Sequence, residues 1–266
     1  TITNGSFLSG RTISAFDGSI DNITITNGNL YGSVHADYNL TSLRVVAGAD
    51  GVFGDIGVNP SLSQGASYDS FRNQLPPNTF ARTGVQGPTI YAGINIVNVT
   101  VTNGSVFETT FGAGRVIQNV TITGSVANDS LTASNANVFF AGDLIDRVTI
   151  TGSADRVSFL AGLTGFGDDG LLGGEDEDAD TIKSGSMNVV TIGGALSNAT
   201  FSAGVNAGNG IYNDGIGETV ALGLSSVNTL AVTGAVTNSS IYADSLSASV
   251  ANDNRFTRVT NLTSAD

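Results

Sequence analysis

One segment of the chain reads Ile20-Asp21-Asn22-Ile23-Thr24-Ile25-Thr26-Asn27-Gly28. It consists of an apolar residue, two variable positions and an alternating run of β-branched residues that ends at a turn glycine. The pattern returns at Ile96–Gly104, Ile117–Gly124, Ile145–Gly152, Met187–Gly194 and Val227–Gly234, and another copy starts at Phe256. Alternation of apolar and polar residues with a period of two predicts a half-buried β-strand.

A second pattern has Ser or Thr, an apolar residue, any residue and then Ala-Gly. It occurs at Thr89–Gly93, Thr110–Gly114, Ser158–Gly162 and Thr200–Gly204, with Ser240–Asp244 as a variant. The step from turn glycine to alanine is nine residues, as from 104 to 113, and the step from alanine to the next valine is seven, as from 113 to 120. The two patterns therefore alternate in a unit of about 20 residues.

Short strands that recur with this period predict an all-β fold, a right-handed parallel β-helix. We expect one domain over residues 1–266, with about nine coils that give roughly 40 Å of solenoid. Val120, Ile122, Val148 and Ile150 should point inward, and Thr121 and Thr149 outward. The apolar residue before each first strand is expected to form a third short side, and examples are Ile20, Ile96, Ile117 and Ile145.

The segment Leu43-Arg44-Val45-Val46-Ala47-Gly48 fits either strand pattern. We prefer the second pattern, because Phe80–Gly84 can then serve as the next first strand. Asparagine precedes several Val-Thr runs, as at Asn98 and Asn119. These Asn-x-Thr sites are better explained as asparagine ladders at a coil corner than as glycosylation acceptors.

Three insertions interrupt the repeat near residues 49–78, 163–185 and 205–225. Each is taken to follow an Ala-Gly, so we expect all three on one edge of the solenoid. The middle insertion places seven carboxylates within the thirteen residues 168–180: Asp168, Asp169, Glu175, Asp176, Glu177, Asp178 and Asp180. A hard cation such as Ca²⁺ takes six to eight oxygen ligands, so these residues are candidate Ca²⁺ ligands. A solvated acidic loop is the alternative.

The composition argues against several classes of function. A net charge of −13 disfavours nucleic acid and anionic membranes as partners, and no stretch is long and apolar enough for membrane insertion. Cysteine is absent and His35 is the single histidine, so zinc and thiol chemistry are disfavoured. His35 matches an outward strand position. The arginines are scattered and no catalytic motif is present, which predicts that the chain is not an enzyme.

Three motifs carry a resemblance to known proteins: the Val-Thr-Ile-Thr-Gly strands, the Ser-Phe-x-Ala-Gly strands and the Asp-Gly-Val-Phe-Gly segment at 50–54. The chain resembles the repeats of very large secreted bacterial parallel β-helix surface proteins, over most of residues 20–246. The resemblance implies a structural role at the cell surface, in a surface layer (S-layer), sheath, adhesin or filament, and carries over no catalytic residues.

The strand motif begins at Thr1 and returns at Val259, and no cap is evident at either place. We therefore expect end-to-end stacking on other copies or on neighbouring solenoid segments of a longer chain. The alternative function is a glycan-binding or glycan-processing β-helix. Aromatic residues and paired carboxylates on neighbouring coils would favour that alternative.

Overall fold

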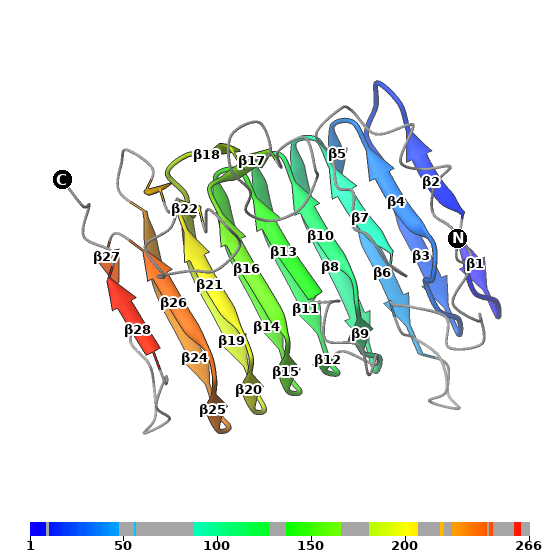
Figure 1. The fold of residues 1–266 in the computed structure, drawn as a ribbon. Coiled ribbons are helices and arrows are strands. Elements are labelled where there is room, and N and C mark those ends of the chain that lie inside the picture. Colours follow the sequence, from blue (N-terminus) through cyan, green and yellow to red (C-terminus); the bar gives the residue numbers. More distant parts are fainter. Residues whose placement is uncertain are drawn as a thin grey trace, which may run out of the picture.

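The computed structural model describes residues 1–8, 11–47, 56, 88–127, 137–165, 181–206, 219–220, 225–243, 245–246 and 258–261. All regular structure in these ranges is β, and most of it lies in three parallel sheets that run along one solenoid (Figure 1). Neighbouring strands in a sheet come from successive coils. The predicted parallel β-helix is therefore confirmed.

The first sheet holds the Val-Thr strands, in the order β1-β3-β6-β8-β11-β14-β19-β24-β27, with β5 beside β8. Its strands are Ile2–Thr3 (β1), Ile23–Thr26 (β3), Asn39–Leu40 (β5), Leu43–Val46 (β6), Asn95–Thr102 (β8), Val116–Ile122 (β11), Leu144–Ile150 (β14), Ser186–Ile192 (β19), Ser226–Val232 (β24) and Ser245–Leu246 (β27).

The second sheet holds the strands of the Ala-Gly pattern, in the order β2-β4-β7-β10-β13-β16-β21-β26-β28. They span Thr12–Ala15 (β2), Ser33–Ala36 (β4), Thr89–Ala92 (β7), Thr110–Ala113 (β10), Asn137–Ala141 (β13), Val157–Ala161 (β16), Thr200–Ala203 (β21), Ser240–Ala243 (β26) and Arg258–Asn261 (β28). These nine strands agree with the predicted coil number.

The third sheet is short, and it lies at a different point of the coil from the predicted third side. It contains Val106–Phe107 (β9), Val126–Ala127 (β12), Ala154–Asp155 (β15), Leu196–Ser197 (β20) and Val236–Thr237 (β25), and single bridges continue it through Ile56 and Leu30 to Phe7. The third side thus follows the turn glycine. Ile96, Ile117 and Ile145 were wrongly assigned to it, because they lie inside first-sheet strands β8, β11 and β14. Ile20 forms a single bridge with Leu40.

The ambiguous segment at 43–48 is also corrected. β6 pairs with β3 and β8, so Leu43–Val46 belongs to the first sheet and not to the second. Leu43 and Val45 continue the inward columns of Ile23 and Ile25, which explains this register. Phe80–Gly84, which the rejected assignment required as a strand, lies outside the described residues.

Two of the three insertions leave the solenoid at the same point of the coil. The insertion near 163–185 follows β16 and starts as an antiparallel pair of Leu163–Gly165 (β17) and Thr181–Ile182 (β18). The insertion near 205–225 follows β21 and starts with Val205–Asn206 (β22) and Thr219–Val220 (β23). The insertion near 49–78 instead follows the first-sheet strand β6, so the prediction of one common edge is wrong for it.

The core consists of columns of identical or similar side chains. Val120, Ile122, Val148 and Ile150 are fully buried, whereas Thr121 and Thr149 are only half-buried on the outer face, as predicted. Phe111, Phe139, Phe159 and Phe201 stack with ring centroids 4.8, 4.9 and 4.9 Å apart. This spacing equals the distance between parallel strands, so in-register pairing places each ring on the next.

The Ala-Gly corner is explained by close approach of the backbone. A Cβ atom added to Gly114 would lie 2.0 Å from the carbonyl oxygen of Gly93, and one added to Gly142 would lie 2.1 Å from that of Gly114. No side chain fits between the coils at these two positions, and the motif therefore ends in glycine there.

Candidate functional surface

The predicted Ca²⁺ ligands cannot be placed. Asp168, Asp169, Glu175, Asp176, Glu177, Asp178 and Asp180 all lie outside the described residues. Elsewhere, in the ranges that the structure does describe, no group of three or more His, Asp or Glu side chains is arranged to hold a metal ion.

The base of the acidic insertion is attached to the neighbouring coils by charge. The Lys183 ammonium pairs with one oxygen of the Asp143 carboxylate, and Arg115 Nε lies 2.9 Å from the other. These contacts hold the pKa of Asp143 below its ordinary value, with the hydrogen bond from Lys183 as the largest cause. The three side chains are partly exposed, so the cluster anchors the insertion only modestly.

The outer face of the second sheet is apolar and covered near its middle. Val138, Phe140 and Leu160 point away from the solenoid core, yet they are almost fully buried. Leu163 and Ile182, from the base of the acidic insertion, pack against them. The Phe140 ring lies over Gly112 of the adjacent strand, where a side chain would collide with it. The described base of this insertion therefore covers part of the second sheet.

His35 has the outward orientation that the strand pattern predicted, because it alternates with the core residues Val34 and Ala36. It is nevertheless only 2% exposed. Its ring stacks on Tyr91 at a centroid distance of 5.4 Å and lies 6.4 Å from Phe16. Its Nε2 atom is 2.8 Å from Asp37 Oδ1. Because His35 is buried among aromatic rings and contacts Asp37, we interpret it as a structural residue that holds these side chains in place.

Asp37 joins two neighbouring turns at the corner between the second and first sheets. Its Oδ2 atom accepts a 2.6 Å hydrogen bond from the backbone N–H of Asp17 on the preceding coil. This bond is the largest cause that holds the pKa of Asp37 below its ordinary value, and His35 adds to it. The Asp37 carboxylate is therefore ionised at neutral pH. Burial raises the pKa of Tyr91, and the negative charge of Asp37 raises it further.

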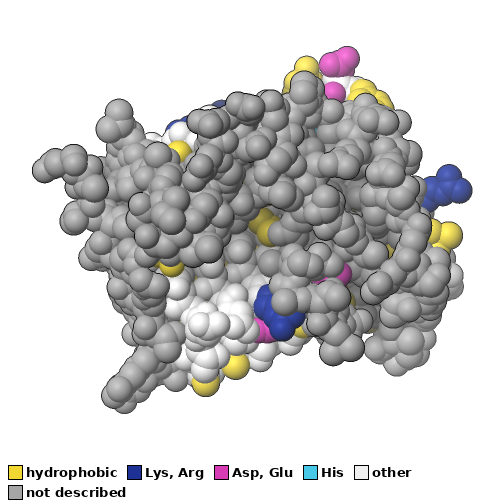
Figure 2. Space-filling model, viewed as in Figure 1, with side chains coloured by type: hydrophobic (Ala, Val, Ile, Leu, Met, Phe, Trp, Pro, Cys, Tyr) yellow, Lys and Arg dark blue, Asp and Glu magenta, His cyan; other side chains and the backbone are white. Residues whose placement is uncertain are grey.

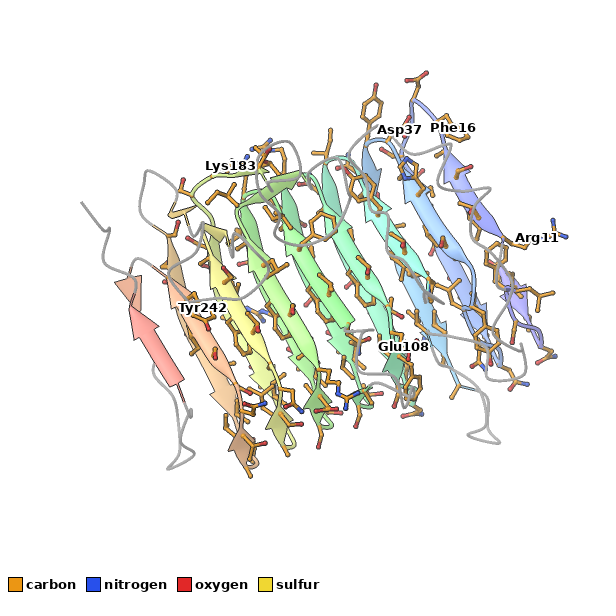
Figure 3. All side chains as sticks on the ribbon, viewed as in Figure 1. Arg11, Phe16, Asp37, Glu108, Lys183 and Tyr242 are labelled. Atoms are coloured by element: carbon orange, nitrogen blue, oxygen red, sulfur yellow. The ribbon has the colours of Figure 1, made fainter. Side chains whose placement is uncertain are left out.

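Two large aromatic side chains are exposed at this same corner. Phe16 is 60% exposed and Tyr38 is 46% exposed, and the Tyr38 N–H donates to the carbonyl of Gly18. Figure 3 shows Phe16 and Asp37 on adjacent turns, and Figure 2 shows hydrophobic and acidic side chains together at this edge. The repeat pattern alone did not reveal this group. The available signal was that Phe16-Asp17 and Asp37-Tyr38 follow Ala15 and Ala36, where most later coils have glycine.

The outer face of the first sheet carries polar ladders. The Asn119 side-chain amide donates to Asn98 Oδ1 at 2.7 Å, and Asn228 donates to Asn188 at 3.0 Å. A row of threonines pairs in register on the same strands: Thr100, Thr121, Thr149 and Thr191. The predicted asparagine ladders are present, but they lie inside first-sheet strands and not at a coil corner as predicted.

The first coil leaves the ends of the core columns open. Ile2, Phe7 and Ile13 pack on the core but are only partly buried, whereas their partners one coil further on, Ile25, Leu30 and Val34, are fully buried. Leu8, beside them, is 58% exposed. A further coil stacked on this surface would bury these side chains.

Searches of protein-family models, curated proteins and solved structures find no match to the chain. Among the described residues, no helix is long and apolar enough to cross a membrane. The fold thus defines the class of protein, which is a parallel β-helix.

Proposed function

We propose that the chain is a non-enzymatic structural module of an extracellular surface layer, sheath, adhesin or filament. Its solenoid would add to further coils end to end, supplied by other copies or by neighbouring solenoid segments of a longer chain. The observation that supports this role most directly is the open first coil. Ile2, Phe7 and Ile13 expose the ends of three core columns, and Leu8 adds exposed apolar surface next to them.

The strand edges support the same contact. Among the described residues, β1 and β2 are the edge strands of their sheets, and each pairs with one neighbouring strand. Such an edge is a template for another strand. A head-to-tail contact between solenoids does not close on itself, so it would propagate into a filament or a lattice row.

The proposal is tested by the oligomeric state of the purified chain. We expect light scattering to show concentration-dependent oligomers, and electron microscopy to show rows one solenoid wide. Leu8→Glu should shift the association to higher concentration by about tenfold or more, because it places a charge on the apolar end. Leu8 is exposed, so this change leaves the fold intact.

Gln118→Glu is the matched control, because it adds the same charge at an exposed position on the side of the solenoid. It should leave assembly unchanged. A wild-type chain that stays monomeric at high concentration, or equal effects of the two substitutions, would refute end-to-end self-assembly.

A further inference from the structure

We infer that the corner formed by Phe16, Asp17, Asp37 and Tyr38 is a binding site for a polysaccharide whose sugars carry free amino groups. This role goes beyond assembly, because the four residues lie on the side of the first two coils and not on the end surface around Leu8.

The first argument is a departure from the repeat. At Gly93, Gly114 and Gly142 this corner has glycine, and the backbones stack so closely that a Cβ atom would lie within 2.1 Å of a carbonyl oxygen. The first two coils have Phe16 and Asp37 in its place. Fold stability accounts for Asp37, which binds the Asp17 N–H and His35, but not for the ring of Phe16, which is 60% exposed and needs another explanation.

The second argument is that hydrogen bonds hold the backbone of the corner and the Asp37 side chain in place. The Asp17 N–H binds Asp37 Oδ2 at 2.6 Å, and the Tyr38 N–H binds the Gly18 carbonyl at 3.0 Å. Beneath the corner, the buried His35 holds Asp37 and stacks on Tyr91. A site whose backbone and charged group are held in place before binding loses less conformational entropy when a ligand arrives.

The third argument is the chemistry of the exposed groups. Phe16 and Tyr38 are two of the three large hydrophobic side chains exposed in the described residues, and both lie at this corner. Their ring faces can pack against the C–H faces of a pyranose and attract a cation. The carboxylates of Asp17 and Asp37 supply the negative charge that an ammonium group requires, and they would repel an acidic glycan.

The spacing favours a sugar polymer over a basic peptide. The turns that carry Phe16 and Tyr38 are neighbours in the stack, about 4.8 Å apart. This distance is close to the length of one sugar unit in an extended polysaccharide. Each aromatic turn can therefore meet one unit of the chain, with its amino group directed to a carboxylate.

The test is binding of a glucosamine hexamer to the whole chain, measured by titration calorimetry at low salt. The fully N-acetylated hexamer, polygalacturonate and a lysine hexapeptide serve as comparison ligands. We expect binding of the glucosamine hexamer only, and weaker binding at high salt. The double variant Phe16→Ala/Tyr38→Ala should lower the affinity by about tenfold or more.

Two further variants make the result specific. Asp17→Asn should weaken binding, because it removes one carboxylate charge and keeps the shape of the side chain. Leu8→Ala removes the third exposed hydrophobic side chain and should not change the affinity. Phe16→Tyr keeps an aromatic ring at the corner and should retain binding of the glucosamine hexamer. Circular dichroism checks that each variant is folded.

Absence of glucosamine binding, or full affinity in the double variant, overturns the proposal. Equal binding of the N-acetylated hexamer also overturns it, because the amino group would then play no part. Equal or tighter binding of the lysine hexapeptide assigns the corner to a basic peptide instead. None of these outcomes depends on the oligomeric state, which the Leu8→Glu experiment tests separately.

Discussion

Ile122 shows how strictly each coil position is specified. Its side chain is fully buried in the column of Ile150 and Ile192, whereas its neighbour Thr121 faces outward. Ile122→Asp would place a charge in a narrow apolar core and should destabilise the fold by about 4 kcal/mol or more. Thr121→Asp should cost less than about 1 kcal/mol. Denaturant unfolding of the two variants checks this, and similar losses for both would refute the register.

The glycines at 112 and 114 should respond differently to substitution. A Cβ atom at Gly112 meets the Phe140 ring, whereas one at Gly114 meets the backbone carbonyl of Gly93. A side chain can move aside more easily than a stacked coil. We therefore expect Gly114→Ala to lower the melting temperature more than Gly112→Ala.

Phe140 provides the control for this comparison. Its replacement by alanine should largely cancel the added effect of Gly112→Ala, so the double variant should be close to Phe140→Ala alone. The same Phe140→Ala change should not rescue Gly114→Ala. Rescue of both glycine variants, or of neither, would contradict this explanation of the two positions.

Asp37 should make the free energy of unfolding depend on pH in the acid range. Its pKa is lower in the folded chain than its ordinary value of 3.8. The ionised form is therefore favoured by folding, and this contribution is present above pH 3.8 and is lost as the pH falls through the folded pKa. Asp37→Asn should lower stability at neutral pH and flatten the loss between pH 5 and the folded pKa, in unfolding curves measured across this range.

The exposed Thr41, which carries no titratable group, gives the comparison for that experiment. Thr41→Ala should leave the acid limb of the stability profile as steep as in the wild type. If Asp37→Asn behaves in the same way, the hydrogen bonds from Asp17 and His35 do not stabilise the folded corner.

At the scale of elements, the acidic insertion is the place where Ca²⁺ binding can be tested. If residues 168–180 bind Ca²⁺ as their carboxylates suggest, a chelator should lower the melting temperature and excess Ca²⁺ should restore it by mass action. Mg²⁺ should restore it less well, because it requires a smaller octahedral site. Replacement of Asp176 and Asp178 by asparagine should reduce the response. Identical melting curves with and without chelator would exclude a stabilising ion.

The strands of the two long sheets were predictable because each coil repeats the same physical requirements. Alternation identifies the inward residues, and the fixed steps between turn glycine, alanine and valine set the register. A third side was predicted but placed at the wrong residues, because its strands have only two residues, which is too short for a period to appear. β6 was misassigned because Ala47-Gly48 imitates the second pattern, whereas Leu43 and Val45 fill columns of the first sheet.

The surface features were less predictable than the strands. Burial of the outward His35 depends on Phe16 and Tyr91, which come from other coils, so sequence spacing does not indicate it. The cover over Phe140 depends on Leu163 and Ile182, whose contact requires the insertion to fold back over the sheet. The corner at Phe16 and Tyr38 could have been found by asking where the Ala-Gly rule fails.

At the scale of the whole molecule, each coil touches mainly the coils before and after it. The strand order of the long sheets follows the chain from β1 to β28 without long-range exchanges. Stability in such a solenoid is close to a sum of coil and interface contributions. Central coils, which contain the phenylalanine stack, should therefore open less often than the coils at either end.

The direction of the ladder hydrogen bonds has a mechanical consequence. They join one coil to the next, so they lie along the length of the solenoid, as from Gly114 N–H to Ala92 and from Gly142 N–H to Ala113. A pulling force between the ends loads these bonds along their own direction, and the coils should detach one at a time. Rupture of an uninterrupted 20-residue coil releases about 70 Å of contour length, and a coil with an insertion releases more, so single-molecule force spectroscopy should record a series of steps of unequal length. A single all-or-none rupture would show that the coils resist tension as one unit.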